Sequence, residues 1–600
     1  MDLKISSSVA SRDERAAVDA VLGAPAADAP GAARDTSNLR AVRGGAVLRG
    51  IRHHLLPVLH AINDRVGWIS RGAINYVAER MDVAPAEVYG VASFYALFAM
   101  EPREPRQVHA CIDLACRAMG GPREEDLPDG VHPSPCLGAC ERAPVALVME
   151  AGHPPHHALA APLATNGLAA LASGAWPQPE MSVAAASPQV ARGDSSLVLL
   201  RRVGRVDPSS LDDYRAHDGY RALARAFEIG PAAVIADVTA SGLVGRGGAA
   251  FPTGRKWQAV AAQNATPHHL VCNADESEPG TFKDRVIMEG DPFALIEAMT
   301  IAAYATGCAH GWIYLRGEYP RALHTLERAI AACRAAGLLG DDVLGAGVAF
   351  DVTIIRGAGA YICGEETAIF NSIEGYRGEP RNKPPFPVES GLFGKPTVVN
   401  NVETLVNVPA IVLRGGNEWA TQGTEGSRGR KLFCVSGAVR EPGVYEVEFG
   451  PTLRDLIGLA GGVRDGSEIG SVLLGGAAGG FVGPDDLDLP LTMEATRAAG
   501  ATLGSGVVMV LDRSVDMVDQ LRRIAAFFRD ESCGQCVPCR VGTVRQEELI
   551  SRLARGAHAD DLALLREVGR VMRDASICGL GQTAHNAIDS AIGRLGVLRP

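Results

Sequence analysis

Two groups of cysteines constrain this chain more than any other feature, because the members of each group must meet in space if they bind one metal centre. Near the C-terminus, Cys533, Cys536 and Cys539 follow the pattern C-x2-C-x2-C, and 38 residues separate Cys539 from Cys578. Three thiolates in so short a run suit three corners of a cubane, with the fourth ligand arriving from elsewhere. Tetrahedral zinc prefers separate pairs, so this group favours a [4Fe–4S] cluster.

The second group lies in the first quarter of the chain and consists of two close pairs. Cys111 and Cys116 are separated by four residues, Cys136 and Cys140 by three, and 19 residues lie between the pairs. Four thiolates in this arrangement suit a [2Fe–2S] cluster or an all-cysteine zinc site, and the spacing leaves both open. The N-terminus has early acids and no apolar signal segment, so we expect a cytoplasmic protein, in which disulfides are disfavoured.

A glycine-rich stretch between the cysteine groups predicts a nucleotide-type ligand. It reads GRGGAAFPTGRKW at 245–257, and CNADESEPGTFKDR follows at 272–285. Glycines allow a ligand to approach the backbone closely, the basic side chains suit a phosphate, and ionised acids accept bonds from sugar hydroxyls. The spacing also matches a Rossmann fingerprint, but the Pro252-Thr253-Gly254 run disfavours an ordinary Rossmann turn. A purely structural glycine turn is the other alternative.

Three later segments extend this predicted site. GAGAYICGEET at 357–367 reads as a glycine turn between a strand and a helix, and TVVNNVET at 397–404 offers two adjacent amides. RNKPPFP at 381–387 is a rigid basic loop with one aromatic side chain. Strands are expected within 311–320 and 351–356, with a helix from Pro320. Loops that follow strands are where α/β folds bind their ligands.

These motifs, taken together, resemble the flavin subunit of respiratory complex I and its diaphorase relatives. The resemblance implies FMN, with NAD(H) stacked over it and with Phe251 and Phe386 as aromatic contacts. It implies catalytic roles for Glu278 and Glu366, which would set hydrogen bonds and the field near the flavin. Ser277, where glycine is common, and the absence of a second aromatic after Trp257 depart from that pattern. The expected cofactor-binding residues are Gly245, Arg246, Gly247, Gly248, Phe251, Lys256, Asn273, Asp275, Glu276, Gly364, Glu365, Lys383, Phe386, Asn400, Asn401 and Thr404.

The segment from about 50 to 150 resembles the small thioredoxin-like subunit of complex I. EVYGVASFY at 87–95 and PCLGAC at 135–140 carry the likeness, which implies that Cys111, Cys116, Cys136 and Cys140 ligate [2Fe–2S]. The gap between the cysteine pairs is shorter than that family leads us to expect, so one helix is expected to be trimmed or missing. The SCGQCVPCRVGT run at 532–543 similarly resembles the [4Fe–4S] region of the flavin subunit.

The fold class we predict is multidomain α/β. The expected parts are a flexible or weakly helical lead-in (1–45), a helical bundle (46–100), a thioredoxin-like [2Fe–2S] domain (101–160), a linker (161–194), an FMN/NAD(H)-binding domain (195–425), a ubiquitin-like domain of the SLBB type (430–512) and a helical [4Fe–4S] domain (513–600).

Composition and motifs together predict a NAD(H):FMN electron-transfer subunit of a larger redox complex. The net charge of −11 argues against nucleic acid, and no apolar run is long enough for membrane insertion. The expected partner is the molybdenum or tungsten catalytic subunit of a NAD-dependent formate dehydrogenase, because SPCLGACERAP and NADESEPGTFKDR look closest to its fused β subunit. Complex I and a NAD-reducing hydrogenase are the alternatives. A non-catalytic iron–sulfur scaffold and a zinc-binding regulator are the hypotheses from other classes.

Overall fold

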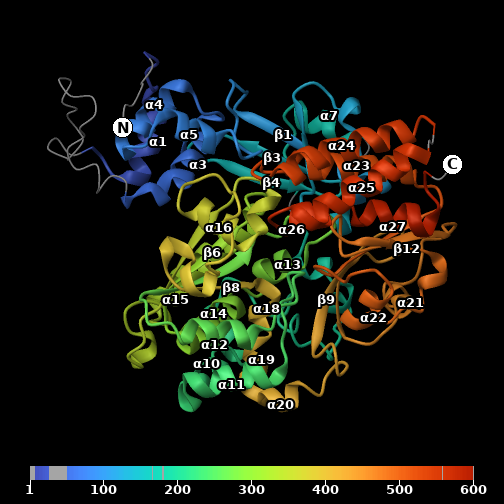
Figure 1. Cartoon of the computed structure of the whole chain (residues 1–600). Helices are drawn as coiled ribbons and strands as arrows, with labels where there is room; N and C mark the ends of the chain where they lie inside the picture. The colour runs from blue at the N-terminus through green and yellow to red at the C-terminus, as the bar shows by residue number, and fades with distance from the viewer. Residues whose placement is uncertain (1–6, 26–49, 165, 179–180, 557–558, 599–600) are drawn as a thin grey trace.

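The structure is a computed structural model that describes residues 7–25, 50–164, 166–178, 181–556 and 559–598 of the chain. Among these residues it has three sheets and many helices (Figure 1), and it confirms the predicted multidomain α/β class. In the ranges just given, no helix combines the length and apolarity needed to cross a bilayer.

The N-terminal part is helical and begins earlier than the sequence suggested. In α1 (Arg12–Leu22), Ser11 and Glu14 form a reciprocal capping box, and the helix contacts α3 (Leu55–Val66). This piece of the predicted lead-in is therefore a regular helix, whereas 1–6 and 26–45 lie outside the described residues. The other elements here are η1 (Arg52–His54), α4 (Arg71–Met81) and α5 (Pro85–Ala92).

A four-stranded sheet with the order β2-β1-β3-β4 follows. β1 and β2 are parallel, while β3 and β4 pair in antiparallel fashion. Only two short helical segments separate β1 from β2, in line with the trimmed helix that the cysteine spacing predicts. The elements of this part and of the segment after it are β1 (Arg106–Cys111), α6 (Leu114–Ala118), η2 (Glu124–Asp126), β2 (Val131–Ser134), η3 (Cys140–Arg142), β3 (Ala146–Glu150), β4 (His156–Ala160), α7 (Gly167–Ala172), η4 (Val183–Ala186) and α8 (Pro188–Ala191).

The central domain is a parallel sheet with the order β7-β6-β5-β8, covered by helices (Figure 1). The chain runs from β5 outward through β6 to β7, and then returns to place β8 on the other side of β5. The topological switch point therefore lies between β5 and β8, where ligands bind at the carboxyl ends of the strands. The predicted strands within 311–320 and 351–356 are β6 and β7, and the helix expected from Pro320 is α15.

The central domain contains the following helices and strands. They are α9 (Leu211–Ala216), α10 (Arg221–Ile229), α11 (Pro231–Ser241), α12 (Thr253–Ala261), β5 (His268–Ala274), α13 (Lys283–Gly290), α14 (Pro292–Thr306), β6 (Cys308–Leu315), α15 (Pro320–Ala335), η5 (Val343–Gly345), β7 (Asp351–Arg356), η6 (Tyr361–Gly364), α16 (Glu366–Ile373), α17 (Pro387–Ser390), η7 (Leu392–Gly394), β8 (Thr397–Asn401), α18 (Val402–Val406), α19 (Val408–Arg414) and α20 (Gly416–Trp419).

A five-stranded sheet with the order β10-β9-β13-β11-β12 forms the next domain and has a hydrophobic core of its own. β9 and β13 pair in parallel at its centre, as in a β-grasp fold. Its elements are β9 (Arg430–Gly437), β10 (Gly443–Glu448), α21 (Leu453–Leu459), β11 (Ile469–Leu474), β12 (Gly480–Val482), η8 (Pro484–Asp486), α22 (Met493–Ala498) and β13 (Val507–Asp512).

The last part is a helical bundle beside the first sheet (Figure 1). Its first helix contacts α6 of the cysteine-bearing domain, and its last helix packs on β12. Its helices are α23 (Met517–Asp530), α24 (Val537–Leu553), α25 (Ala559–Ala575), α26 (Gly579–Thr583) and α27 (Asn586–Leu595).

Candidate functional site: a cavity between two cysteine groups

A cavity of about 380 Å³ opens at the switch point of the parallel sheet. Its floor comes from residues at or just after the ends of β5 and β8, and further walls come from the β-grasp domain and from α26. Nine predicted site residues line it: Gly247, Gly248, Asn273, Asp275, Glu276, Glu278, Gly364, Glu365 and Asn401. Ser277 lines it too.

The glycine-rich loop approaches the cavity as closely as its sequence suggests. A Cβ atom at Gly247 would lie 3.2 Å from the Cβ atom of Asn401, and Gly248 has a φ of +122° that side-chain-bearing residues rarely adopt. The loop closes on itself through the N–H of Gly245, which donates to the carbonyl of Phe251 (2.9 Å). A larger side chain at these glycines would therefore narrow the cavity or strain the loop.

Asp275 offers an unsatisfied acceptor at the site. Its Oδ2 is buried and has no hydrogen-bond partner among the described residues. Burial raises the pKa of this carboxyl well above its ordinary value. The side chain of neighbouring Asn273 is already used, because its Nδ2 donates to the carbonyl of Gly364 (2.9 Å). A buried acceptor without a partner fits a ligand hydroxyl, as the ribityl chain of FMN would supply.

The other two acids after β5 have protein partners. The carboxylate of Glu276 accepts the backbone N–H groups of Asp284 (2.8 Å) and Arg285 (3.0 Å) at the start of α13, so it caps this helix. Glu278 accepts from the hydroxyl of Tyr361 (2.6 Å) and from the N–H of Ala478 (2.9 Å). Burial raises the pKa of Glu278 to about 7 and that of Glu276 to about 8.

Three expected cofactor ligands lie behind the cavity. Arg246 is 1% exposed, and its guanidinium donates to the carbonyl of Arg428 and lies over the ring of Phe449, both outside the parallel-sheet domain. The backbone N–H of Arg246 donates to Thr404 Oγ1 (2.8 Å). Asn400 Oδ1 accepts the indole N–H of buried Trp257 (2.9 Å). These side chains support the loop and the end of β8 and do not line the cavity.

A cluster of charges joins the glycine-rich segment to the later loops. Lys256 Nζ lies 3.4 Å from Glu366, and Lys383 Nζ lies 2.9 Å from Glu365 and 2.8 Å from Glu366. Glu365 also caps α16 through the N–H groups of Thr367 and Ala368. Of this cluster only Glu365 lines the cavity.

The two aromatic side chains expected to hold a nicotinamide nucleotide lie on the surface. Phe251 is 50% exposed and Phe386 is 52% exposed. Lys256 Nζ lies 5.8 Å from the centre of the Phe251 ring. The structure therefore leaves both rings open to solvent and to a planar ligand.

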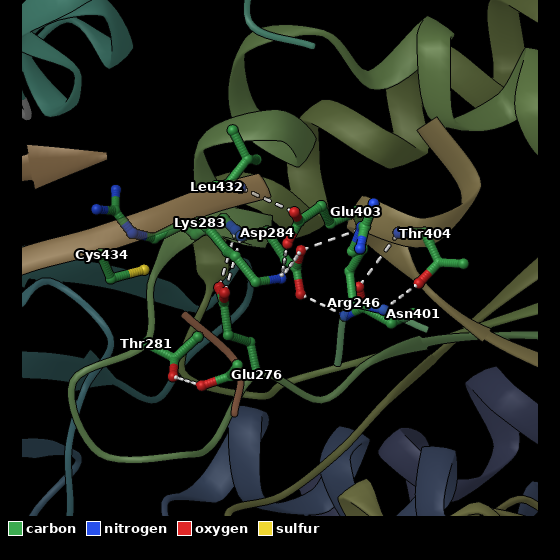
Figure 2. A network of polar contacts seen from close by, with 12 residues as sticks. Arg246, Glu276, Thr281, Lys283, Asp284, Asn401, Glu403, Thr404, Leu432 and Cys434 are labelled. Carbon is green, nitrogen blue, oxygen red and sulfur yellow. Dashed lines mark hydrogen bonds and ion pairs between the residues drawn. The ribbon is translucent and has the colours of Figure 1, made fainter. Parts of the chain in front are cut away.

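A buried charge network at the wall of the cavity was missed by the sequence analysis (Figure 2), and two of its members, Lys283 and Asp284, line the cavity. Lys283, fully buried, lies 2.7 Å from Asp284 and 3.0 Å from Glu403. Lys431, from β9, lies 3.9 Å from Glu403. Burial alone would lower the pKa of Lys283, but the carboxylates around it raise the pKa above its ordinary value. The sequence signal for this network was the TFKDR run at the end of the second motif. Glu403 and Lys431, which complete the network, lie more than 100 residues further along the chain.

The structure brings the first cysteine group together. Cys111, the last residue of β1, interacts with the side chains of Cys116 and Cys136, and Cys136 Sγ lies 3.3 Å from Cys140 Sγ. The backbone of Gly280, from the loop after β5, interacts with Cys136, and the N–H of Gly138 donates to Cys136 Sγ (3.5 Å). Four gathered thiols fit a [2Fe–2S] cluster.

The second cysteine group gathers at the start of α24 and α26. Cys578 interacts electrostatically with Cys539 and Cys533, and Cys539 with Cys536. Within the described ranges, no three His, Cys, Asp or Glu side chains are arranged to hold a single metal ion. The residues that follow Cys578 directly, Gly579 and Leu580, line the cavity.

The switch-point cavity and the two cysteine groups define a flavin- and iron–sulfur-type oxidoreductase subunit, and comparisons with known proteins agree. Four family models match separate parts of the chain: the Nuo51 FMN-binding domain (238–410), the NADH-ubiquinone oxidoreductase-F iron-sulfur binding region (519–595), the thioredoxin-like [2Fe-2S] ferredoxin (46–125) and the SLBB domain (432–482). The [2Fe-2S] match ends before Cys136 and Cys140.

Individual relatives match about two thirds of the chain. The NADP-reducing hydrogenase subunit HndC of Solidesulfovibrio fructosivorans is 43% identical over 397 residues, which are 66% of this chain and 81% of the relative. The NADH-quinone oxidoreductase F subunit of Aquifex aeolicus is 45% identical over 392 residues, which are 65% of this chain and 91% of the relative. A crystal structure of NAD+-reducing [NiFe]-hydrogenase in the air-oxidized state is similar over 91% of this chain and 92% of that chain, with a TM-score of 0.73 and 31% identity.

The chain therefore belongs to the family of NADH-quinone oxidoreductase F subunits and their hydrogenase relatives, which are NAD(H)-dependent flavin oxidoreductase subunits. The predicted cofactor classes, FMN with [2Fe–2S] and [4Fe–4S] clusters, are those of the matching domains. The sequence left open a zinc-binding regulator and an iron–sulfur scaffold without flavin. The matching domain families are instead described as FMN-binding and iron–sulfur-binding.

Proposed function

We propose that the chain passes electrons between NAD(H) and iron–sulfur clusters by way of FMN bound in the switch-point cavity. The closeness of this one cavity to both cysteine groups carries the proposal: Gly579 and Leu580 of its wall follow Cys578, and Gly280, which precedes Thr281 of its wall, interacts with Cys136. Bound FMN supplies the exchange between a two-electron hydride and single electrons. Clusters at these cysteines would lie next to it on two sides.

The residues of the chain have distinct tasks in this proposal. Gly247 and Gly248 let the ligand approach the backbone, and Asp275 Oδ2 accepts from a ligand hydroxyl. Glu278, held by Tyr361, keeps an acid with a near-neutral pKa on the cavity wall. Phe251 and Phe386 offer exposed rings for stacking NAD(H) above the Lys256–Glu366 pair.

Substitution of Asp275, which removes the unsatisfied acceptor, tests the proposal that FMN binds in this cavity. Asp275→Ala should lower the amount of FMN that copurifies with the full chain while iron content stays near the wild-type value. Asp275→Asn, which keeps one acceptor, should lose less. Full FMN retention in Asp275→Ala, measured by flavin extraction, would contradict the proposed seat of the ligand.

For the partner, we propose the molybdenum or tungsten catalytic subunit of a NAD-dependent formate dehydrogenase. The intact first cysteine group and the SPCLGACERAP and NADESEPGTFKDR segments support it. A NAD-reducing hydrogenase is the second candidate, because the similarity to the hydrogenase chain extends over 91% of this fused chain. Purification of the complex should yield molybdenum or tungsten and formate-dependent NAD+ reduction. If the purified complex contained nickel and reduced NAD+ with hydrogen, the partner would be a hydrogenase and not a formate dehydrogenase.

A further inference from the structure

A single buried arginine connects the cavity loop to the first cysteine group. Arg316 follows the last residue of β6 and is 2% exposed. Its Nη1 donates to the carbonyl of Glu276 (2.9 Å), in the cavity loop, and its Nη2 donates to the carbonyl of Cys136. The planar guanidinium thus bonds to two domains at once, in a geometry that an ammonium group does not reproduce.

The contact around this arginine is closely packed. The hydroxyl of Tyr319, a residue near Arg316 in the chain, donates to Glu276 Oε2 (3.1 Å). A Cβ atom at Gly138 would clash with the same hydroxyl. The backbone of Gly280 also interacts with Cys136. Since no gap separates the two loops here, a charge on Arg316 acts on the sulfur of Cys136 with little solvent screening.

Glu318 forms an ion pair with Arg316, and the carboxyls of Asp275 and Glu531 also interact electrostatically with it. Glu318 Oε1 lies 3.1 Å from Nη2. Glu318 Oε2 and Arg316 Nε have no hydrogen-bond partner among the described residues. Arginine stays protonated under all working conditions. Net charge, burial and hydrogen bonds near the sulfurs set the reduction potential of an iron–sulfur cluster. A fixed positive charge therefore favours the reduced cluster, which carries one more negative charge.

We propose that Arg316 is a positioning residue that holds the Cys136 loop against the flavin cavity and raises the reduction potential of the [2Fe–2S] cluster. The negative charge of Glu318 partly offsets this increase in potential. This inference rests on the proposed ligation of [2Fe–2S] by Cys136 and is independent of which partner the complex contains.

Arg285 is a matched control within the same interface. It is also 2% exposed and binds the same loop, with Nε donating to the carbonyl of Gly138 (2.9 Å). Two carboxylates, Glu141 at 2.6 Å and Glu289 at 3.4 Å, balance its charge. A role in docking alone would make the Arg285 and Arg316 variants alike, whereas an electrostatic role makes them differ.

The test is a redox titration of the full chain with its clusters, in which the electron paramagnetic resonance signal of the reduced [2Fe–2S] centre is followed. Arg316→Gln should shift the potential to more negative values, Arg316→Lys should shift it less, and Glu318→Gln should shift it to more positive values. Arg285→Gln should move it less than Arg316→Gln. The same potential in Arg316→Gln as in the wild type would overturn the proposal.

The Glu318 variant decides the matter if Arg316→Gln loses the cluster or fails to fold. Glutamine keeps an acceptor for Arg316, so Glu318→Gln removes charge with little change of shape. A positive shift supports the proposal, and an absent or negative shift rejects it. FMN content and dye reduction by NADH, measured in parallel, report on the flavin site separately, so failure there concerns the proposed function and not Arg316.

Discussion

Removal of the Lys283 ammonium group should destabilise the cavity domain by an amount that the contacts of the network set. Lys283→Met leaves the carboxylates of Asp284 and Glu403 buried without their shared cation. Breaking a buried ion pair in this way typically costs about 3–5 kcal/mol. We expect the lower end, about 3 kcal/mol. Asp284 still accepts from Asn401 Nδ2 (2.6 Å), and Glu403 still accepts from the N–H of Leu432 (2.8 Å).

Thermal unfolding of the full chain after removal of flavin measures this loss without a contribution from ligand contacts, because Lys283 and Asp284 themselves line the cavity. For a domain of this size each kcal/mol corresponds to roughly 2–4 °C, so the midpoint should fall by about 6–12 °C. The double variant Lys283→Met/Asp284→Asn retains the Glu403–Lys431 pair and should recover much of the difference. An unchanged midpoint in Lys283→Met would refute the argument, and equal losses in both variants would assign the effect to packing instead of charge.

Three further outcomes follow from other contacts. The raised pKa of Glu278, about 7 against an ordinary 4.5, means that its contribution to stability is present below pH 4.5 and is lost as the pH rises to 7. Between pH 5 and pH 8 this loss lowers the free energy of unfolding by about 3 kcal/mol, and with it the midpoint of thermal unfolding. Glu278→Gln, which cannot titrate, should therefore show a smaller fall in the midpoint over this range. The same fall in the variant as in the wild type would assign the pH dependence to other acids. Gly138→Ala should displace Tyr319 and weaken the [2Fe–2S] signal, whereas Gly130→Ala, at a similar positive φ but with open space around it, should not; equal effects would point to backbone strain alone. Cys536→Ser should abolish the [4Fe–4S] signal and long-range transfer while dye reduction by NADH at the flavin persists, and unimpaired long-range transfer in an iron-replete sample would contradict the relay.

Much of the architecture could be predicted from the sequence because its signals are local. Short strand-like runs that end in glycine turns indicated β6 and β7, and the amphipathic pattern after Pro320 indicated α15. The prediction was less specific for α1. Composition indicated a flexible or weakly helical lead-in there, while the Ser11–Glu14 capping box is a short signal that composition conceals.

The candidate site was predictable in its location but not in the task of each side chain. The order of motifs placed Gly247, Asp275 and Asn401 at one sheet edge, since parallel strands end on the same side. Nothing near Arg246 in the sequence shows that its guanidinium turns away to Arg428. Likewise, the helix that Glu276 caps is visible only once the chain is folded. Partners distant in sequence decide which charged groups face the ligand and which support the backbone.

Loops of the β-grasp domain form part of the cavity wall, so the parallel-sheet domain alone does not enclose the cavity. The Thr281 and Ser505 hydroxyls are hydrogen-bonded to each other (2.6 Å), and Glu278 accepts from the N–H of Ala478 (2.9 Å), so loops of both domains meet across the cavity wall. Arg246 ties the glycine-rich loop to the segment just before β9. Movement of the β-grasp domain would break these bonds together and open the wall. Ligand binding in the cavity should therefore stabilise the contact between the two domains, because it favours the closed arrangement in which all three bonds exist.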